Sequence, residues 1–137
     1  MTSGTHSGIV LVDDDPDFLE IHRLLLDEHG YGVEAFSRPD EAWLYLEHAS
    51  PGLVISDLVM DTLDAGFTLC RRIRARPHLA NTKVIIMTSA GSRLGYDFRP
   101  RSPEEMTQMG VDGFLEKPVR PEVLLATVAT FVAKRVE

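Results

Sequence analysis

The chain has 137 residues, 44% of them hydrophobic, which suits one domain with a normal buried core. Its net charge of -7 at pH 7 argues against direct binding to nucleic acid or to anionic membranes, since both attract basic surfaces. A single cysteine, Cys70, excludes an internal disulfide framework and a metal site built from several thiolates, and its apolar neighbours favour a buried residue over a reactive thiol.

Residues 1–7 lack the basic and long apolar regions of a secretory signal, so we interpret them as a flexible leader. The domain then spans residues 8–137. No apolar stretch approaches the roughly 20 residues that a membrane helix requires. Together these features predict a cytoplasmic protein.

The first half of the chain alternates apolar runs with amphipathic stretches. Residues 9–12 are all apolar and predict a buried strand, which ends at three consecutive aspartates. Asp15 and Pro16 are typical of a helix N-cap and first turn, and apolar residues at helical spacing run from Phe18 to a stop at Gly30. The elements predicted next are a strand over 33–36, a helix that opens at 37–40, and a buried strand over 53–56 that ends at Asp57.

The second half continues the alternation but contains an unusual segment before its last strand. Residues 90–103 hold three arginines, two glycines and two prolines, which predicts a long extended loop before a short helix that begins at 103–106. The other predicted elements are a loop over 58–66, a helix over 67–75, a strand over 84–87, a strand over 111–116 and a closing helix over 121–136.

Five strand–helix units in succession predict an α/β fold: a doubly wound, five-stranded parallel sheet with helices on both faces, of the flavodoxin-like (βα)5 kind. Ligands of such folds bind beyond the carboxyl ends of the strands. The polar residues expected at those ends come from four different strands and are Asp13 and Asp14, Asp57, Thr88, and Lys117.

The aspartates at two of these strand ends suggest a metal site. Asp15 is best explained as the helix cap, but Asp13 and Asp14 need another reason, and their repulsion with Asp57 calls for a hard cation. A site built from oxygen ligands alone favours Mg²⁺. A cation beside Asp57 is also what phosphoryl transfer onto that carboxylate requires, and the ammonium of Lys117 would hold a phosphoryl oxygen.

Four ordered segments resemble the motifs of the response regulator receiver domain, the phosphoacceptor module of two-component signalling. They are LVDDDP at 11–16, ISDLVM at 55–60, VIIMTS at 84–89 and GFLEKP at 113–118. The resemblance covers residues 8 to 135 and is to receiver domains that stand alone, as chemotaxis regulators do. It implies Mg²⁺ as the cofactor.

The resemblance also implies a role for each motif residue. Those that would bind the metal are Asp13, Asp14, Asp57 and the backbone carbonyl of Val59, with Asp57 as the phosphoacceptor. Those that would bind the phosphoryl group or report its presence are Thr88, Ser89, Lys117 and Phe114, followed by a cis bond to Pro118. For Phe114, plain core packing stays open as the alternative.

The chain departs from the family pattern near Asp57. Asp61 stands where the family usually has proline, and we interpret it as solvent-facing. Ala65 splits the usual Asp-Gly pair of the following loop, which makes that loop one residue longer. Val59 and Ala90 occupy the positions two after the phosphoacceptor and two after the switch threonine, where polar side chains help to place a hydrolytic water. We therefore predict slow loss of the phosphoryl group.

The largest departure lies between the switch threonine and the lysine. Residues 93–103 look like an insertion in the region that reports phosphorylation to partners in relatives. Tyr96 and Phe98 are candidate contact residues of an altered output surface. A disordered loop is the alternative that stays open.

The resemblance implies a function in a phosphorelay. Asp57 would receive the phosphoryl group from a sensor histidine kinase or a histidine phosphotransfer protein and thereby switch contacts with an unknown output protein, so the chain is not expected to be an enzyme. Nothing follows the last predicted helix, which favours a stand-alone receiver, although a receiver cut from a longer protein stays open. The alternatives are a pseudo-receiver that binds partners without phosphorylation and a phosphatase-like hydrolase with an aspartate nucleophile. The hydrolase needs an acid at the position of Val59.

Overall fold

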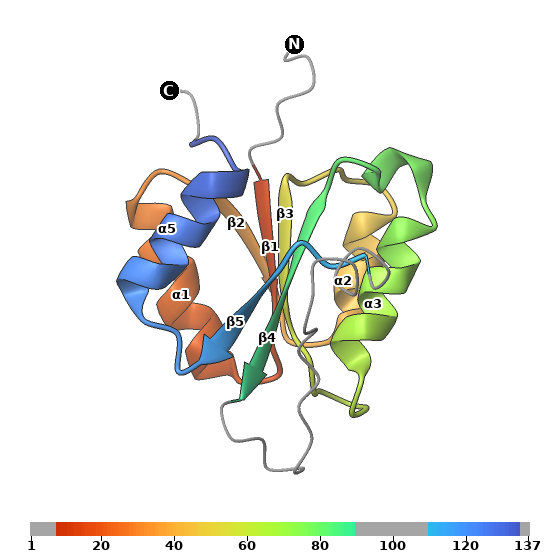
Figure 1. Ribbon diagram of the computed structural model, residues 1–137, viewed down its shortest axis with the longest axis horizontal. Coiled ribbons are helices and arrows are strands. Elements are labelled where there is room, and N and C mark those ends of the chain that lie inside the picture. The colour runs from red at the N-terminus through yellow and green to blue at the C-terminus, as the bar shows by residue number, and fades with distance from the viewer. Residues whose placement is uncertain (1–7, 90–109, 135–137) are drawn as a thin grey trace.

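The sheet has the predicted parallel arrangement. The structure, a computed structural model, describes residues 8–89 and 110–134. Its strands lie in the order β2-β1-β3-β4-β5, and all neighbouring pairs are parallel (Figure 1). The strands are β1 (Gly8–Val12), β2 (Gly32–Phe36), β3 (Leu53–Asp57), β4 (Lys83–Ser89) and β5 (Gly113–Lys117). The chain winds outward in both directions from β1, which confirms the doubly wound fold and puts a switch point between β1 and β3.

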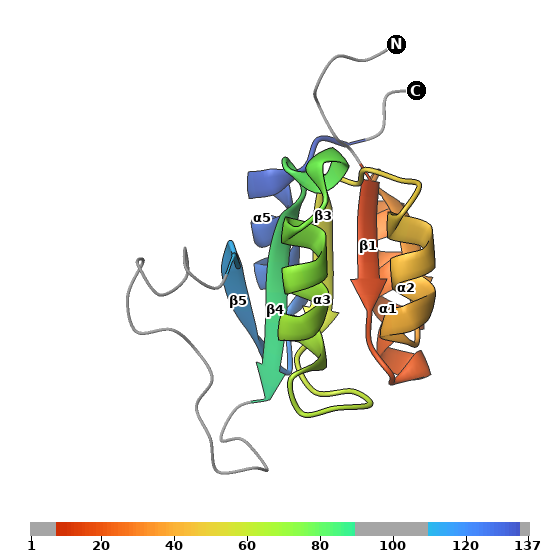
Figure 2. The same ribbon diagram turned by 90° about the vertical axis from the view of Figure 1, so that its right-hand side faces the viewer.

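Helices cover both faces of the sheet, as predicted. On one face lie α1 (Pro16–Glu28) and α5 (Pro121–Phe131), and on the other lie α2 (Pro39–Leu46) and α3 (Ala65–Arg74) (Figure 1 and Figure 2). A short 3-10 helix, η1 (Pro77–Leu79), follows α3. Within the described ranges, every helix is too short or too polar to cross a membrane.

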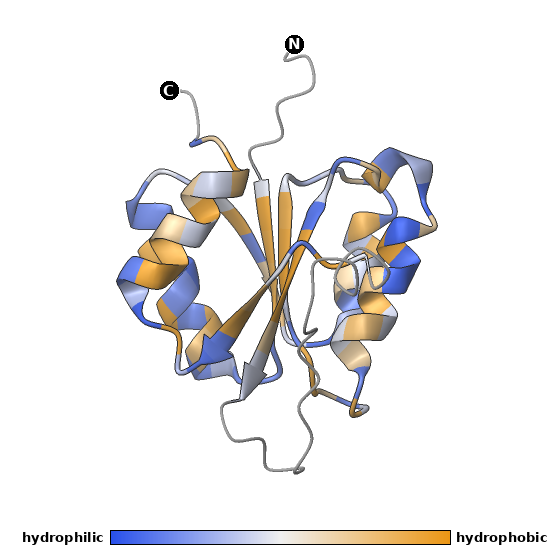
Figure 3. Cartoon of the chain, viewed as in Figure 1, coloured by the Kyte–Doolittle hydropathy of each residue, from blue (hydrophilic) through white to orange (hydrophobic). Residues whose placement is uncertain are grey.

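Strand β1 shows why the sheet is buried on both sides. Val10 and Val12 join the core under α2 and α3, whereas Ile9 and Leu11 join the core under α1 and α5. This division follows because successive side chains of a strand point to opposite faces. All four side chains are at most 1% exposed. The central strands therefore have apolar runs in their middle parts (Figure 3), and these runs make them recognisable from the sequence.

The helix ends depend on a few specific residues. Asp15 caps α1 as predicted, since its side chain accepts hydrogen bonds from two backbone N–H groups of the first turn. The helix stops before Gly30, whose φ of 91° lies in the left-handed region that favours glycine. Gly66 allows α3 to pack closely on β3, because a Cβ there would lie 2.7 Å from the carbonyl oxygen of Asp57. Helix α3 begins at Ala65, two residues before its predicted start.

The predicted end of the closing helix is wrong. We expected a helix over 121–136, but α5 ends at Phe131, and Val132 has an extended backbone with φ of -135° and ψ of 139°. Val132 is only 7% exposed, so leaving the helix keeps this β-branched side chain against the core. The chain then carries Lys134 to the ring of Tyr31, with Nζ 6.0 Å from the ring centroid.

Strand β5 begins at Gly113 instead of at residue 111. Before it, the carboxylate of Asp112 accepts hydrogen bonds from the backbone N–H of Val84 and from Arg74, both at 2.8 Å. The carboxylate of Asp112 thus takes the place of a backbone carbonyl as the hydrogen-bond acceptor for the N–H of Val84. The predictions that fall outside the described residues are the leader over 1–7, the loop over 90–103, the helix that begins at 103–106, and the roles of Ala90, Tyr96 and Phe98.

Candidate functional site

The carboxyl ends of four strands meet at one edge of the sheet. The register of β1 on β3 places Asp13 and Asp57 at neighbouring strand ends. The registers of β3 on β4 and of β4 on β5 bring Thr88 and Lys117 to the same edge. Side chains 104 positions apart in the chain are thereby brought into contact, as Asp13 and Lys117 show.

Three carboxylates form the centre of this edge. One oxygen atom from each of Asp13, Asp14 and Asp57 lies within 4.8 Å of the other two. Asp13 is fully buried and Asp57 is 9% exposed, whereas Asp14 is exposed. A set of oxygen ligands with one solvent-facing side fits a hard cation that keeps part of its water shell, as Mg²⁺ does. Asp61 in the following loop is exposed, as predicted.

The ammonium group of Lys117 faces these acids from the end of β5. Its Nζ atom lies 2.6 Å from Oδ2 of Asp13 and 3.4 Å from Oδ2 of Asp57. Burial by itself lowers the pKa of Lys117, but the hydrogen bonds and charges of Asp13 and Asp57 outweigh burial and leave that pKa raised. The side chain therefore stays charged at neutral pH. The peptide bond between Lys117 and Pro118 is cis.

Asp57 is the acid whose proton affinity the site changes most clearly. Burial raises its pKa to about 6, against the opposing charge of Lys117 and with the support of the negative charges of Asp13 and Asp14. Ionised Asp57 is therefore held at a cost in the metal-free protein. A bound cation would remove much of that cost, because it would offset the charges that gather here.

We expect the ionisation of Asp57 to destabilise the metal-free protein. Its pKa of about 6 in the folded state lies above the ordinary value of 3.8, so the folded state binds this proton more tightly than the unfolded state. The resulting stabilisation is complete below pH ~4 and is lost as the pH rises through ~6. The amide side chain of the Asp57→Asn protein does not titrate, so this variant has no such pH-dependent loss. Its free energy of unfolding relative to that of wild type should therefore rise by about 2 kcal/mol across this window.

Urea unfolding of both proteins from pH 4 to pH 7 in the presence of EDTA measures this difference. Taking the difference between the two proteins cancels the titration of groups that they share. A difference that stays constant with pH, or one that falls as pH rises, would contradict the prediction.

The remaining predicted residues lie at or near the same edge. Thr88 is half-buried at the end of β4, and Ser89 after it is exposed. Val59 follows β3 in the loop, and its side chain packs against the core under α2 and α3. Phe114 on β5 packs against the same core, and its ring meets that of Phe67 edge-on with centroids 6.4 Å apart. In this conformation Phe114 therefore contributes to packing.

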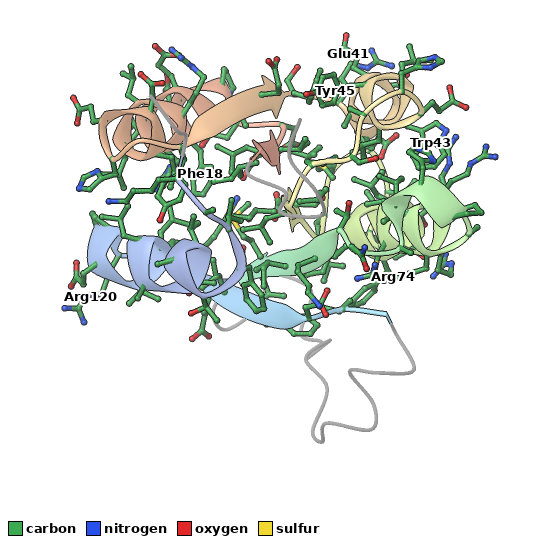
Figure 4. The ribbon with its side chains drawn as sticks, turned by 90° about the horizontal axis from the view of Figure 1, so that it is seen from above. Phe18, Glu41, Trp43, Tyr45, Arg74 and Arg120 are labelled. Atoms are coloured by element: carbon green, nitrogen blue, oxygen red, sulfur yellow. The ribbon has the colours of Figure 1, made fainter. Side chains whose placement is uncertain are left out.

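One residue at the site was not assigned to it from the sequence. Phe18 has the spacing of a core position of its helix, and it is indeed partly buried against the core. Its ring also faces the site, because Nζ of Lys117 lies 4.5 Å from the ring centroid. Figure 4 shows Phe18 between α1 and α5. The signal in the sequence is its position in the first helical turn after the acidic motif, four residues beyond Asp14.

Comparisons with known proteins agree with this architecture. Residues 9–129 match the family described as the response regulator receiver domain. Response regulator Rre1 of Synechocystis sp. is 33% identical over 133 residues, which cover 93% of this chain and 52% of Rre1. An uncharacterised 14.6 kDa protein of Leptolyngbya boryana is 31% identical over 123 residues, which cover 90% of this chain and 88% of that protein. This chain thus spans about half the length of Rre1.

Solved structures show the same fold. The chemotaxis response regulator CheY4 of Vibrio cholerae superposes with a TM-score of 0.76 at 25% identity, covering 92% of this chain and 98% of CheY4. The signal receiver domain of a histidine kinase from Syntrophus aciditrophicus has a TM-score of 0.74 at 32% identity, covering 96% of this chain and 95% of that domain. Both likenesses extend over nearly the whole chain.

Proposed function

Because the chain belongs to the response regulator receiver domain family, we propose that it is a Mg²⁺-dependent phosphoacceptor whose Asp57 takes a phosphoryl group from a phosphohistidine. The donor would be a sensor histidine kinase or a histidine phosphotransfer protein. The observation that carries this proposal is the meeting of three carboxylates and one ammonium group at a single sheet edge. In a module of two-component signalling, these carboxylates would supply the nucleophile and the metal ligands for phosphoryl transfer, and the ammonium group would supply positive charge.

The proposed chemistry is a single displacement at phosphorus. An oxygen of the Asp57 carboxylate attacks the phosphorus atom while the bond from phosphorus to the histidine nitrogen breaks, and the bonding electrons return to the imidazole. The chain would hold Mg²⁺ through Asp13, Asp14 and Asp57, with the backbone carbonyl of Val59 as a further ligand. When bound, the metal ion supplies positive charge next to the phosphoryl oxygens.

The other site residues would bind the product and report its presence. Lys117 would donate a hydrogen bond from its ammonium group to a phosphoryl oxygen on Asp57, and the 3.4 Å distance between its Nζ and Oδ2 of Asp57 supports this role. We assign Thr88 and Ser89 to the remaining oxygens and Phe114 to the conformational response. New acceptor oxygens at this edge would then alter contacts with an output protein. Slow loss of the phosphoryl group follows in this proposal from the apolar side chain of Val59.

Incubation of the protein with acetyl phosphate and Mg²⁺ tests the proposal. We expect the intact mass to rise by one phosphoryl group, peptide mapping to place it on Asp57, and EDTA to prevent the reaction. Wild-type protein that stays unlabelled but binds partners would indicate a pseudo-receiver instead. Rapid turnover of acetyl phosphate without a stable adduct would indicate a hydrolase, which Val59 disfavours because it cannot act as a general acid.

A further inference from the structure

The contact between Phe18 and Lys117 supports an inference that deepens the proposed function and rests on it. We propose that Phe18 is a positioning residue that holds the ammonium group of Lys117 beside Asp57 for phosphoryl transfer. The Nζ atom of Lys117 lies 4.5 Å from the centroid of the Phe18 ring. A cation at this distance is attracted by the electron-rich face of an aromatic ring.

The ring of Phe18 is itself held in place by its surroundings. The backbone N–H of Phe18 donates to Oδ1 of Asp15 at 3.4 Å, which ties this residue to the helix cap. The ring stacks on His22, with centroids 3.9 Å apart and planes inclined by 25°. Nδ1 of His22 lies 2.7 Å from the carbonyl oxygen of Phe18, so the imidazole is oriented by the same helix. Lys117 therefore meets a ring whose position is set by contacts within α1.

Lys117 needs such a contact because its polar partners are shared with the proposed metal ion. Its flexible stem is directed by Asp13 at 2.6 Å and by Asp57 at 3.4 Å, and both of these acids belong to the acidic cluster. A divalent cation in that cluster would reduce their attraction for the ammonium group. The attraction of the Phe18 ring does not depend on those charges. The ring therefore contributes most in the state in which phosphoryl transfer takes place.

Substitutions of Phe18 test this inference with acetyl phosphate as the donor, so that docking of a kinase does not enter the result. Phe18→Leu keeps an apolar side chain but removes the aromatic face, whereas Phe18→Tyr keeps that face. We expect Phe18→Leu to slow phosphorylation about fivefold and to weaken beryllofluoride binding to a similar extent, in line with one partly exposed cation–π contact. The Phe18→Tyr protein should stay close to wild type.

Phe131→Leu is the matched control. Phe131 lies at the end of α5 and is also partly buried against the core that Phe18 contacts. The two leucine variants should lose similar stability in urea unfolding, but only Phe18→Leu should lose phosphorylation rate. Equal rates for the two leucine variants would overturn the inference, and so would a Phe18→Tyr protein as slow as Phe18→Leu.

A second measurement needs neither metal nor phosphoryl donor. In the NMR spectrum of the metal-free wild-type protein, ring-current shielding by Phe18 should move the ε-methylene protons of Lys117 upfield. The shift should disappear in Phe18→Leu and remain in Phe131→Leu. Absence of this upfield shift from the wild-type spectrum would overturn the inference without reference to any variant.

The phosphorylation results also distinguish the two proposals. Failure of wild type to become phosphorylated would count against the proposed function. A wild type that is phosphorylated, together with a Phe18→Leu protein that is phosphorylated equally fast, would count against this inference alone.

Discussion

The Asp57→Asn protein should incorporate no phosphoryl group from acetyl phosphate or from a phosphorylated histidine kinase. The amide that replaces the carboxylate is a poor nucleophile and a weaker metal ligand, so the substitution removes both the attacking atom and part of the cation site. Intact-mass spectrometry after incubation with Mg²⁺ and acetyl phosphate measures the result. We expect the mass increase to disappear completely, because Asp57 is the residue of each chain that would accept the phosphoryl group.

Asp61→Asn is the matched control for this experiment. Asp61 lies in the loop after β3, is exposed, and loses the same charge on substitution. It should be phosphorylated at the wild-type level. Phosphoryl incorporation that survives in Asp57→Asn, or that is lost equally in both variants, would contradict the assignment of Asp57.

The loss in Asp57→Asn would not reflect unfolding. Asp57 is ionised at neutral pH at a cost, since burial raises its pKa to about 6. The variant should therefore be at least as stable as wild type at pH 7 when metal is absent. A protein that gains stability while it loses its reaction separates the chemistry of the site from the stability of the fold.

The Lys117→Gln protein should show the second large effect, a fall of about a hundredfold in the rate of phosphorylation. The ammonium group is the positive side chain that the structure places 3.4 Å from the Asp57 carboxylate, where charge would build up on the phosphoryl oxygens. Removal of one such preorganised donor typically costs about 10²–10³ in rate. Single-turnover labelling with acetyl phosphate at saturating Mg²⁺ measures the change.

The same substitution should also destabilise the metal-free protein. Asp13 is fully buried, and its Oδ2 accepts a 2.6 Å hydrogen bond from Lys117, which is 21% exposed. Loss of the partner leaves the buried carboxylate of Asp13 without this positive charge, although its Oδ1 keeps the 2.9 Å hydrogen bond from the backbone N–H of Asp15. We expect a cost of about 2–3 kcal/mol after allowance for the partial exposure of the lysine. Added Mg²⁺ should restore part of this stability, because a cation in the acidic cluster replaces the missing positive charge.

Lys83→Gln is the control for both measurements, since Lys83 is an exposed lysine at the start of β4. It should match wild type in rate and in the free energy of unfolding. A Lys117→Gln protein that is phosphorylated as fast as Lys83→Gln would show that the ammonium group does not act on the reaction. Unchanged stability of Lys117→Gln in EDTA would show that the pair with Asp13 contributes little.

Much of the fold could be predicted because β1 and β3 at its centre are buried on both faces. Strands of this kind form uninterrupted apolar runs, so the change to acids after Val12 and at Asp57 marks where each strand ends. The cap at Asp15 and the stop at Gly30 depend on local backbone preferences and were recognised for that reason. The early end of α5 was missed because helical spacing continues past Phe131, and only packing against the core decides that Val132 is extended.

The sequence by itself determined the class of fold and the kinds of side chain at the strand ends, because both follow from patterns that span only a few neighbouring residues. Only the tertiary structure decided which atoms meet there. The ammonium of Lys117 lies closer to Asp13 than to Asp57, and the ring of Phe18 lies against it. Contacts between residues about a hundred positions apart depend on strand register, helix placement and side-chain conformation together, and no local pattern in the chain encodes their combination.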